Sequence, residues 1–448
     1  MEIKMYSDPF QNRYGSDIMR QIWNDKNKYK LWRQLWLSLA QAQSFTKMVE
    51  IPTKTLERME EVVECIDIDK INEYDKQNGH DVYAAILEYR DQCGPEHGKY
   101  IHLGATSQYV VDNADCVRIR HSLVYLINNG KKLMDAIVMR ASCDKTTPCL
   151  GYTHGQKAQI TTIGRRISMW GESVMMCLRE IDRMESSMKW RGTKGAVGNQ
   201  TGYCYINPKK VSLMEDCICS DFGFTPFDNC GQTYHRTQDI MIVSSLVALS
   251  SALAKMCNDI RLLCMVGEAS EKKLEVGSSA MPYKSNPITS EKVCSLARTM
   301  TGYLNTFIDT ASNQWLERSL DDSANRRVLL SKIFLTVDEI IMCCIKIMKE
   351  TRFFMDPRKL EEHLPYAVME WAVTKATTLG YDRTKMHEKM RRLSESSLNS
   401  SQLINRVLAT PELKNVDTKI ARTIGTHLGN SVAQTENFIS LTKENSIP

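Results

Sequence analysis

The stretch GSSAMPYKSNP, residues 277–287, interrupts a chain that otherwise has the composition of long helices. Its glycine and prolines allow sharp turns and close approach of the backbone to a ligand. Lys284 and Asn286 lie two residues apart and could both reach one anionic group, and the run ITSEKVCSLAR after Pro287 predicts a helix whose N-terminal dipole favours anions. From these residues alone, the stretch is either an anion-binding loop with a serine nucleophile or base, or a flexible polar connector.

Long runs without glycine or proline surround this loop. They cover residues 105–129, 172–191, 232–266 and 303–356. In the third run, apolar residues such as Ile240, Val243 and Leu246 recur close to helical spacing, and a helix of that length would measure roughly 52 Å. Helices that are apolar over much of their circumference would leave faces uncovered in a monomer. We therefore expect burial against other subunits, with a monomeric bundle closed on itself as the alternative.

Proline punctuation is denser toward the two ends of the chain, and strand signals are sparse. We expect an all-α protein with three domains. These are an N-terminal helical domain over residues 1–105, a central long-helix bundle that carries the loop over 106–356, and a C-terminal helical domain over 357–448.

Composition argues against several classes of protein. Lys and Arg number 58 against 53 Asp and Glu, and a net charge of +5 is too small to indicate nucleic-acid binding. The 15 cysteines show no matched C-x2-C pairs, so no zinc site is expected. The N-terminus lacks the apolar core of a signal peptide, and the longest apolar stretch, residues 242–254, is too short to span a bilayer. We expect a cytoplasmic protein with reduced thiols.

Two further stretches concentrate reactive side chains. In GYTHGQKAQITT, residues 151–162, His154 is a candidate acid or base because its ordinary pKa lies near neutrality, although a lone histidine is more often structural. In QWLERSLDDSANRR, residues 314–327, the arginines and Ser323 suit phosphate recognition. The alternative for the second stretch is a solvated salt-bridge network.

Together, these stretches resemble the fumarase/aspartase superfamily, whose signature loop has the form GSS-x-MP-x-K-x-NP. Within the superfamily the chain is similar to the adenylosuccinate lyases, particularly the eukaryotic type. Other matching stretches follow in family order: NRYGS (12–16), GHDVYA (79–84), HLGATSQYVVDNAD (102–115), WRGTKGAVGNQ (190–200) and GQTYHR (231–236). The resemblance implies a homotetramer whose central helices form a twenty-helix core, with each active site shared by three subunits.

The resemblance also implies a reaction. It is β-elimination of fumarate from adenylosuccinate, giving AMP, and from succinyl-aminoimidazole carboxamide ribonucleotide, with no metal or organic cofactor. Matched residue by residue, it assigns Ser278 as the general base, His154 as the general acid, Glu291 as the carboxylate that orients His154, Lys284 as a cation beside the base, and His80 with its neighbour Asp81 as a second essential histidine.

Substrate contacts are implied in the same way. The succinyl carboxylates would be held by Thr106, Ser107, Thr153, Gln232, Lys284 and Asn286, and the phosphate and ribose by Arg13, Tyr14, Arg318, Ser323 and Arg327. Three residues depart from the family pattern. Ser285 stands where relatives often carry arginine or valine, a change that is expected to be tolerated. Lys292 stands where eukaryotic relatives usually carry arginine, which would replace a bidentate contact with a point charge. Lys157 replaces a proline and is expected to loosen the turn after His154.

Two alternatives to this activity remain. The first is another lyase of the superfamily, such as argininosuccinate lyase or fumarase, whose substrates carry no phosphate for the arginine cluster. The second is a non-catalytic structural relative, which would have no need of the five residues Ser278, His154, Lys284, Asn286 and Glu291. We also expect the segment 268–287 to be mobile without ligand, because it offers little apolar surface to bury.

Overall fold

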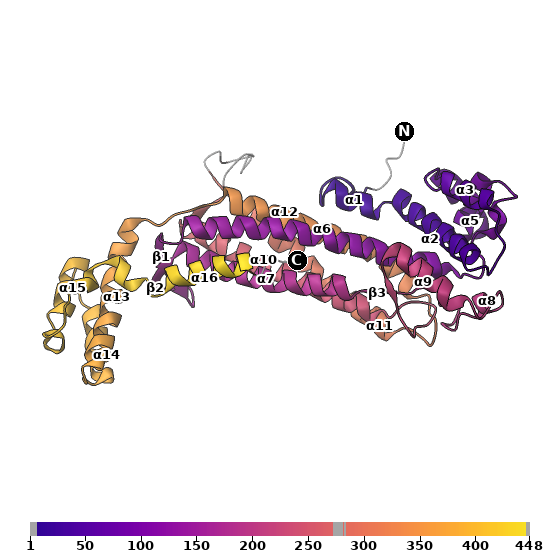
Figure 1. Cartoon of the computed structure of the whole chain (residues 1–448). Coiled ribbons are helices and arrows are strands. Elements are labelled where there is room, and N and C mark those ends of the chain that lie inside the picture. Colours follow the sequence, from indigo (N-terminus) through magenta and orange to yellow (C-terminus); the bar gives the residue numbers. More distant parts are fainter. Residues whose placement is uncertain (1–6, 272–280, 282–283, 445–448) are drawn as a thin grey trace. The chain divides into compact units, whose positions relative to one another are not determined.

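The structure is a computed structural model that describes residues 7–271, 281 and 284–444. The described residues are mostly helical, as expected (Figure 1). The longest helices are α6 (Ser107–Cys143), α7 (Ile163–Ser187), α10 (Thr237–Met265), α11 (Ile288–Ser312) and α12 (Asp322–Glu350). Residues 272–280 and 282–283 lie outside the description, and with them Ser278 and most of the segment expected to be mobile, so both expectations stay predictions.

Shorter helices occupy both ends of the chain and the connections. The α-helices among them are α1 (Asp17–Trp23), α2 (Asp25–Phe45), α3 (Thr53–Glu61), α4 (Ile68–Asn78), α5 (Asp81–Cys93), α8 (Thr201–Cys204), α9 (Val211–Phe222), α13 (Pro357–Thr378), α14 (Arg383–Ser394), α15 (Ser400–Leu408) and α16 (Ser431–Glu444). The 3-10 turns are η1 (Pro9–Gln11), η2 (Gly98–Tyr100), η3 (Pro411–Leu413), η4 (Ile420–Arg422) and η5 (Ile424–His427).

The strands are short and form two-stranded sheets. β1 (Pro148–Thr153) and β2 (Gln156–Thr162) form an antiparallel hairpin, β3 (Lys189–Trp190) pairs in parallel with β4 (Thr225–Pro226), and β5 (Ala269–Ser270) pairs antiparallel with β6 (Arg352–Phe353).

The chain forms two compact units, each built from separated segments. The first unit comprises Met1–Gly130, Cys177–Ser251 and Ser295–Ile341, and the second comprises Lys131–Met176, Ala252–Cys294 and Met342–Pro448. The long helices contribute residues to both units. The three-domain division expected from the sequence stays a prediction.

Helix α6 continues past the glycine that ends its glycine-free run. A Cβ atom at Gly130 would lie 2.4 Å from Leu178 Cδ2, so the missing side chain allows α7 to pack closely against α6 at this point. Glycine costs a helix interior about 1 kcal/mol relative to alanine. Close packing against Leu178 accounts for a glycine at this position.

The run 303–356 contains two helices rather than one. Helix α11 ends at Ser312 and α12 begins at Asp322, although no glycine or proline lies between them. Leu316 adopts a φ of 49°, which is incompatible with a continuing right-handed helix. The Asn313 side-chain amide donates to the backbone oxygen of Asp309 at 2.8 Å, so a polar side chain occupies a carbonyl at the helix end.

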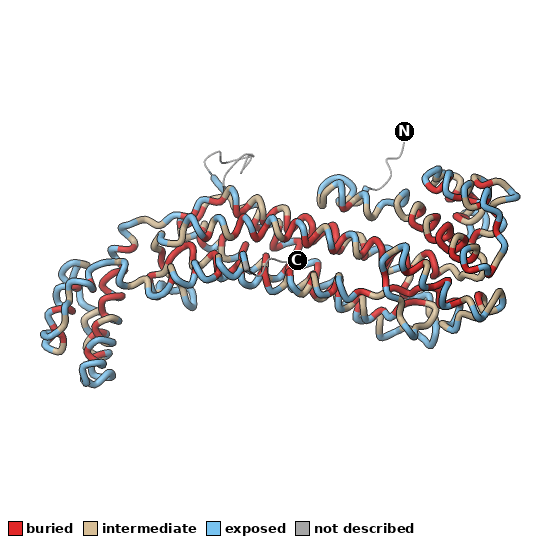
Figure 2. The backbone as a smooth tube through the Cα atoms, in the orientation of Figure 1, coloured by how far each residue is buried: buried red, intermediate tan, exposed pale blue. Residues whose placement is uncertain are grey.

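Helix α10 is the most apolar long helix. Buried residues recur along the long helices (Figure 2), and in α10 they include the fully buried Leu246, Leu249 and Leu253. By length and composition alone this 29-residue helix could cross a membrane, with 50% of its most apolar window buried inside the chain. The expectation that this region is too short to span a bilayer was therefore wrong. The finding is weak evidence of a membrane span, because core helices meet the same criteria.

In the second unit, α13, α14 and α15 pack around a common apolar core (Figure 1). Leu150 of β1 and Ile160 of β2 are buried in the same core. Contact with these helices thus fixes the apolar face of the hairpin. The hairpin turn, at residues 154–155, remains exposed.

Candidate active site

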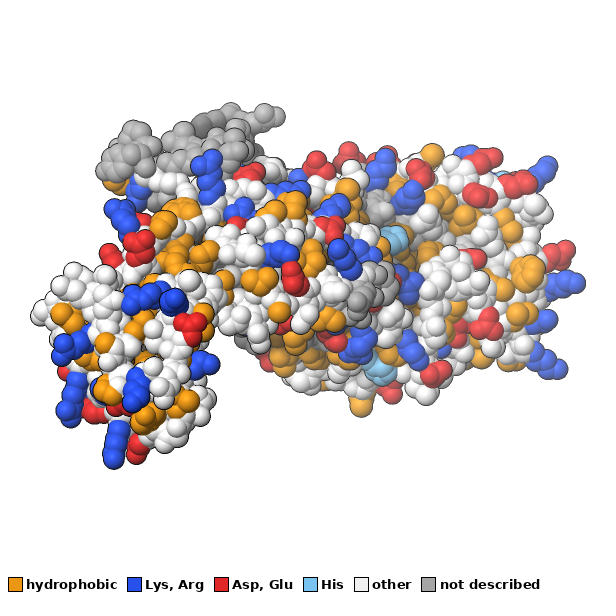
Figure 3. All heavy atoms as spheres, turned by 60° about the vertical axis from the view of Figure 1, so that its left-hand side comes forward, with side chains coloured by type: hydrophobic (Ala, Val, Ile, Leu, Met, Phe, Trp, Pro, Cys, Tyr) orange, Lys and Arg blue, Asp and Glu red, His pale blue; other side chains and the backbone are white. Residues whose placement is uncertain are grey.

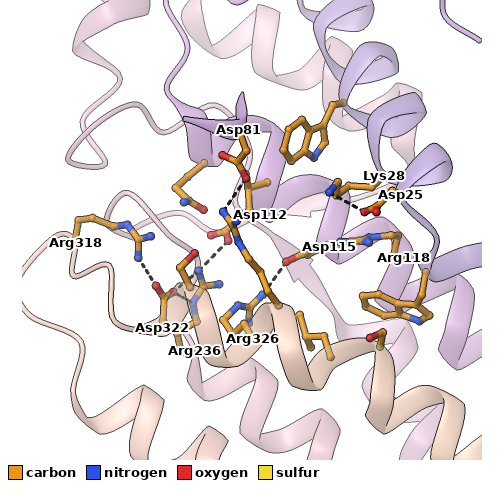
Figure 4. A pocket seen from close by; sticks show the side chains of 18 residues that line it. Asp25, Lys28, Asp81, Asp112, Asp115, Arg118, Arg236, Arg318, Asp322 and Arg326 are labelled. Carbon is orange, nitrogen blue, oxygen red and sulfur yellow. Dashed lines mark hydrogen bonds and ion pairs between the residues drawn. The ribbon is translucent and has the colours of Figure 1, made fainter. Parts of the chain in front are cut away.

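A cavity of about 310 Å³ in the first unit contains several of the predicted substrate residues (Figure 4). Its walls come from α1, α2, α5, α6 and α12 and from the residues just before α10 and α12. The predicted residues in its lining are Asp81, Arg318, Ser323 and Arg327. The remaining charged side chains of the lining are Asp25, Lys28, Asp112, Asp115, Arg118, Arg236, Asp322 and Arg326.

The two predicted phosphate- or ribose-binding arginines that line the cavity are paired with carboxylates. Arg318 Nη1 donates to Asp322 Oδ1 at 2.6 Å, and Arg327 Nη2 donates to Asp81 Oδ2 at 2.7 Å. The Arg327 side chain is 61% exposed, whereas that of Arg318 is 16% exposed. A bound anion would therefore have to share these arginines with their carboxylates or displace the carboxylates. Breaking the more exposed Arg327–Asp81 pair would cost less free energy than breaking the Arg318–Asp322 pair.

A buried charge network lies behind these two pairs. Arg236 donates to Asp112 Oδ1 at 2.9 Å and to Asp322 Oδ2 at 2.8 Å, and Arg326 donates to Asp115 Oδ2 at 3.2 Å. Burial alone would raise the pKa of Asp115, but nearby arginines hold it below its ordinary value. The network fixes the first turns of α12 against α6.

Sequence analysis missed this network. The acidic residues Asp112 and Asp115 are separated by three positions in the quoted stretch of α6, and Arg118 follows after three more, so all share one helical face. Charged residues at that spacing inside an otherwise apolar helix are the signal that could have identified it.

His80 and Ser107, two of the predicted site residues, lie beside each other in the first unit. His80 caps the N-terminus of α5, where its Nδ1 accepts a hydrogen bond from the backbone N–H of Tyr83 at 3.2 Å. An accepting Nδ1 leaves the proton of the neutral ring on Nε2, which lies 3.3 Å from Ser107 Oγ. The imidazole therefore donates to the serine hydroxyl, and the adjoining Asp81 holds Arg327.

Thr106 and Gln232 are also joined, through a residue that sequence analysis did not select. Arg191 Nη2 donates to Thr106 Oγ1 at 3.2 Å, and Arg191 Nε donates to the backbone oxygen of Gln232 at 2.5 Å. Arg191 lies in the quoted stretch 190–200, but only its contacts distinguish it from the other polar residues there. We call the set His80, Asp81, Thr106, Ser107, Arg191 and Gln232 the polar arc.

His154 forms the turn of the β1–β2 hairpin in the second unit. Thr153 pairs with Gln156, and the two residues between them, His154 and Gly155, have φ values of 52° and 73°. Two successive residues of positive φ are typical of a tight type I′ hairpin turn. The turn presents the imidazole to solvent. Lys157 pairs with Tyr152 in the ladder, so it stands directly beside this turn.

The N-terminus of α11 begins at Ile288, as the sequence predicted. The predicted residues here are Lys284 and Glu291, which are exposed, and Asn286 and Lys292, which are half-buried. The sequence predicts an anion at the start of this helix, and in the structure the carboxylate of Glu271 occupies that position. Glu271 accepts hydrogen bonds from the backbone N–H groups of Thr289 at 3.1 Å and Ser290 at 3.0 Å.

Arg13 and Tyr14 lie in the first unit but outside the cavity lining. The Arg13 guanidinium is 5.9 Å from the centre of the Tyr14 ring. The adjoining N–H groups of Gly15 and Ser16 donate to carboxylates of α12, at 3.0 Å and 2.7 Å, which fixes this segment to the helix that carries Arg327.

The predicted catalytic groups are thus divided between the units. His154, Lys284 and Glu291 belong to the second unit, whereas His80 belongs to the first, and Ser278 lies outside the described residues. Within the described ranges of one chain, His154 makes no hydrogen bond or ion pair with Glu291. The same ranges contain no group of three or more His, Cys, Asp or Glu side chains arranged to hold a metal ion.

Comparison with known proteins decides the family. The family model described as "Lyase" matches residues 1–302. The chain belongs to this lyase family. The lyase-family relatives it resembles include adenylosuccinate lyase of Schistosoma mansoni, 35% identical over 88% of this chain and 84% of that protein. Adenylosuccinate lyase of Saccharomyces cerevisiae is 32% identical over 99% of this chain and 95% of that protein.

Solved structures support the same lyase-family fold. The 3-carboxy-cis,cis-muconate lactonizing enzyme from Pseudomonas putida has a TM-score of 0.84 over 97% of this chain and 99% of that chain, at 20% identity. A fumarate lyase from Mesorhizobium has a TM-score of 0.81 at 18% identity. At these identities the likeness concerns the fold alone.

Proposed function

We propose that this chain is an adenylosuccinate lyase. It would eliminate fumarate from adenylosuccinate to give AMP, and from succinyl-aminoimidazole carboxamide ribonucleotide in the same way. The observation that carries the proposal is the position of Arg318, Ser323 and Arg327 in one cavity. Lyases whose substrates lack a phosphate have no use for such a cluster. Relatives of that name match nearly the whole chain.

In the proposed reaction, Ser278 removes a proton from the carbon beside a succinyl carboxylate. The intermediate carries two negative charges on that carboxylate, so it requires hydrogen-bond donors and cations that are already in place. The polar arc supplies hydroxyl and amide groups for this purpose, and Lys284 supplies a cation. His154 then protonates the departing purine nitrogen, and the carbon–nitrogen bond breaks to release fumarate.

Assembly is part of the proposal. Following the resemblance, the active site takes residues from three subunits of a homotetramer, so Glu291 would orient His154 across a subunit boundary. Exposed apolar side chains on the long helices support such an assembly. They include Val124, Met139, Met176, Met241, Leu262 and Ile308.

An assay of AMP and fumarate formation tests the proposal. Arg327→Met should raise KM for adenylosuccinate about tenfold or more, because a charge-assisted contact to phosphate is lost. Arg183→Met is the matched control, since Arg183 is similarly exposed and similarly paired with a carboxylate, Glu180, but lies outside the cavity lining. Ser278→Ala should abolish turnover. Wild-type protein that forms no AMP and no fumarate from either purine substrate would overturn the proposal.

A further inference from the structure

Arg191 is a fully buried arginine whose hydrogen bonds all end on neutral oxygens. Its side chain is 0% exposed. It donates to the backbone oxygens of Gln232 and Gly195, both at 2.5 Å, to the backbone oxygen of Gly192 at 3.1 Å, and to Thr106 Oγ1 at 3.2 Å. The guanidinium thereby joins two loops to the residue that precedes α6.

Other buried arginines of the same unit carry their own carboxylates. Arg33 pairs with Glu88, Arg236 with Asp112 and Asp322, and Arg326 with Asp115 and Asp239. Arg191 forms no ion pair with any carboxylate in the described part of the chain. Burial lowers the pKa of Arg191, because removing a cation from water is costly without a carboxylate in direct contact, and the more distant Asp112 and Glu215 offset this cost only in part.

The contacts of Arg191 lie on the groups predicted to bind the succinyl carboxylates. Because Thr106 Oγ1 accepts from Arg191, its own proton is directed elsewhere, and within the described residues that hydroxyl donates no hydrogen bond. A carboxylate that accepted this proton would lie within about 6 Å of the guanidinium. Arg191 also fixes the backbone of Gln232, whose side-chain amide donates to the oxygen of Ala196 at 3.2 Å.

We propose that Arg191 is a positioning residue for the dicarboxylate end of the substrate. It holds Thr106 and Gln232 in place, and its positive charge, which no carboxylate of the described residues contacts directly, attracts a dicarboxylate such as fumarate that binds beside them. This inference rests on the proposed function for the identity of the dicarboxylate. The residue acts through Thr106 and Gln232 rather than by touching the substrate.

The test compares inhibition by the two products. Arg191→Met should raise the inhibition constant of fumarate about tenfold or more, since a buried charge and its hydrogen bonds are lost, and leave that of AMP within about twofold. Arg191→Lys keeps the charge without the planar fork, so its fumarate constant should rise less. The double substitution Arg33→Met with Glu88→Gln removes another buried arginine together with its partner, and should leave both constants unchanged.

Two outcomes would overturn the inference. One is an unchanged fumarate constant in Arg191→Met. The other is an equal rise in the AMP and fumarate constants, which is what a merely structural role predicts. If Arg191→Met does not fold, the fumarate-to-AMP comparison on Arg191→Lys decides between the roles. If wild-type protein does not cleave adenylosuccinate, the proposed function fails, and direct titration of fumarate into wild-type and variant protein still tests Arg191.

Discussion

Protonation of single side chains follows from burial in the first unit, and His102 is the clearest case. Its Nδ1 accepts a hydrogen bond from Trp36 Nε1–H at 2.8 Å. Burial, with smaller contributions from His80 and Arg191, lowers the pKa of His102 to about 4. The folded protein therefore favours the neutral ring.

His102 should make stability depend on pH. Since its folded pKa lies below the unfolded value near 6.5, the unfolded chain binds more protons between about pH 4 and pH 6.5. The contribution is present above that window and is lost as pH falls through it, by about 2 kcal/mol between pH 7 and pH 5. Unfolding in urea at both pH values measures this loss.

His102→Asn is the comparison variant for that measurement. Asparagine tolerates the positive φ of 67° at this position and keeps an acceptor for Trp36. The variant should lose less stability than wild type on acidification. Equal losses in the two proteins would show that His102 does not control this part of the pH dependence.

At the residue scale, the sequence identified groups but not all of their partners. Arg318, Ser323 and Arg327 lie within ten residues of one another in the sequence. Their proximity in the cavity could therefore be predicted from the sequence alone. Arg191 and Thr106 are 85 residues apart, and nothing in either stretch indicates the contact. Only the folded loops bring them together.

Among the elements, the β1–β2 hairpin has the most direct bearing on function. Its two-residue turn requires positive φ at His154 and Gly155, a requirement that asparagine and glycine meet best. Histidine at the first position is thus tolerated rather than favoured by the turn. A role for its imidazole would account for its presence.

His154→Asn separates the turn from the chemistry. Asparagine should keep the hairpin and the melting temperature, while kcat falls about 100-fold or more because the general acid is lost. Gly155→Ala is the complementary control, because it disturbs the turn but keeps the His154 imidazole. It strains the turn at a φ of 73°, so it should lower the melting temperature and affect kcat less. If His154→Asn kept nearly full turnover, the proposed acid role would be wrong.

Element boundaries were predicted less well than element type. The helical periodicity of residues 232–266 matches α10 closely, because that helix has an apolar core face along its length. The break before α12 was not foreseen, since it depends on the positive φ of Leu316 rather than on glycine or proline. The two-residue strands are too short to leave a periodic signal.

At the scale of the whole molecule, the long helices of the single chain expose large apolar side chains to solvent. Met241 and Leu262 of α10 are 51% and 56% exposed in the single chain. On the face shown in Figure 3, hydrophobic side chains lie among the charged ones. Helix faces of this kind are typical of chains that bury them in an oligomer.

Met241→Lys combined with Leu262→Lys should therefore dissociate the proposed homotetramer. A charge placed in a buried helix contact is strongly unfavourable, so sedimentation should detect smaller species, and activity should fall with assembly. Leu379→Lys, at a 52% exposed position just after α13, is the control and should leave the assembly intact. A double variant that sediments like wild type would exclude this helix face as a subunit contact.

The carboxylate of Glu271 at the start of α11 can be regarded as a tethered competitor. An intramolecular ligand acts at an effective concentration in the millimolar range, set by the chain that links it to its receptor. Free anions at lower concentration would therefore displace it poorly from the N–H groups of Thr289 and Ser290. An anion that binds only these two N–H groups would therefore compete poorly with Glu271. A ligand that also contacts other residues of the site could replace Glu271, so this helix end would select for larger ligands.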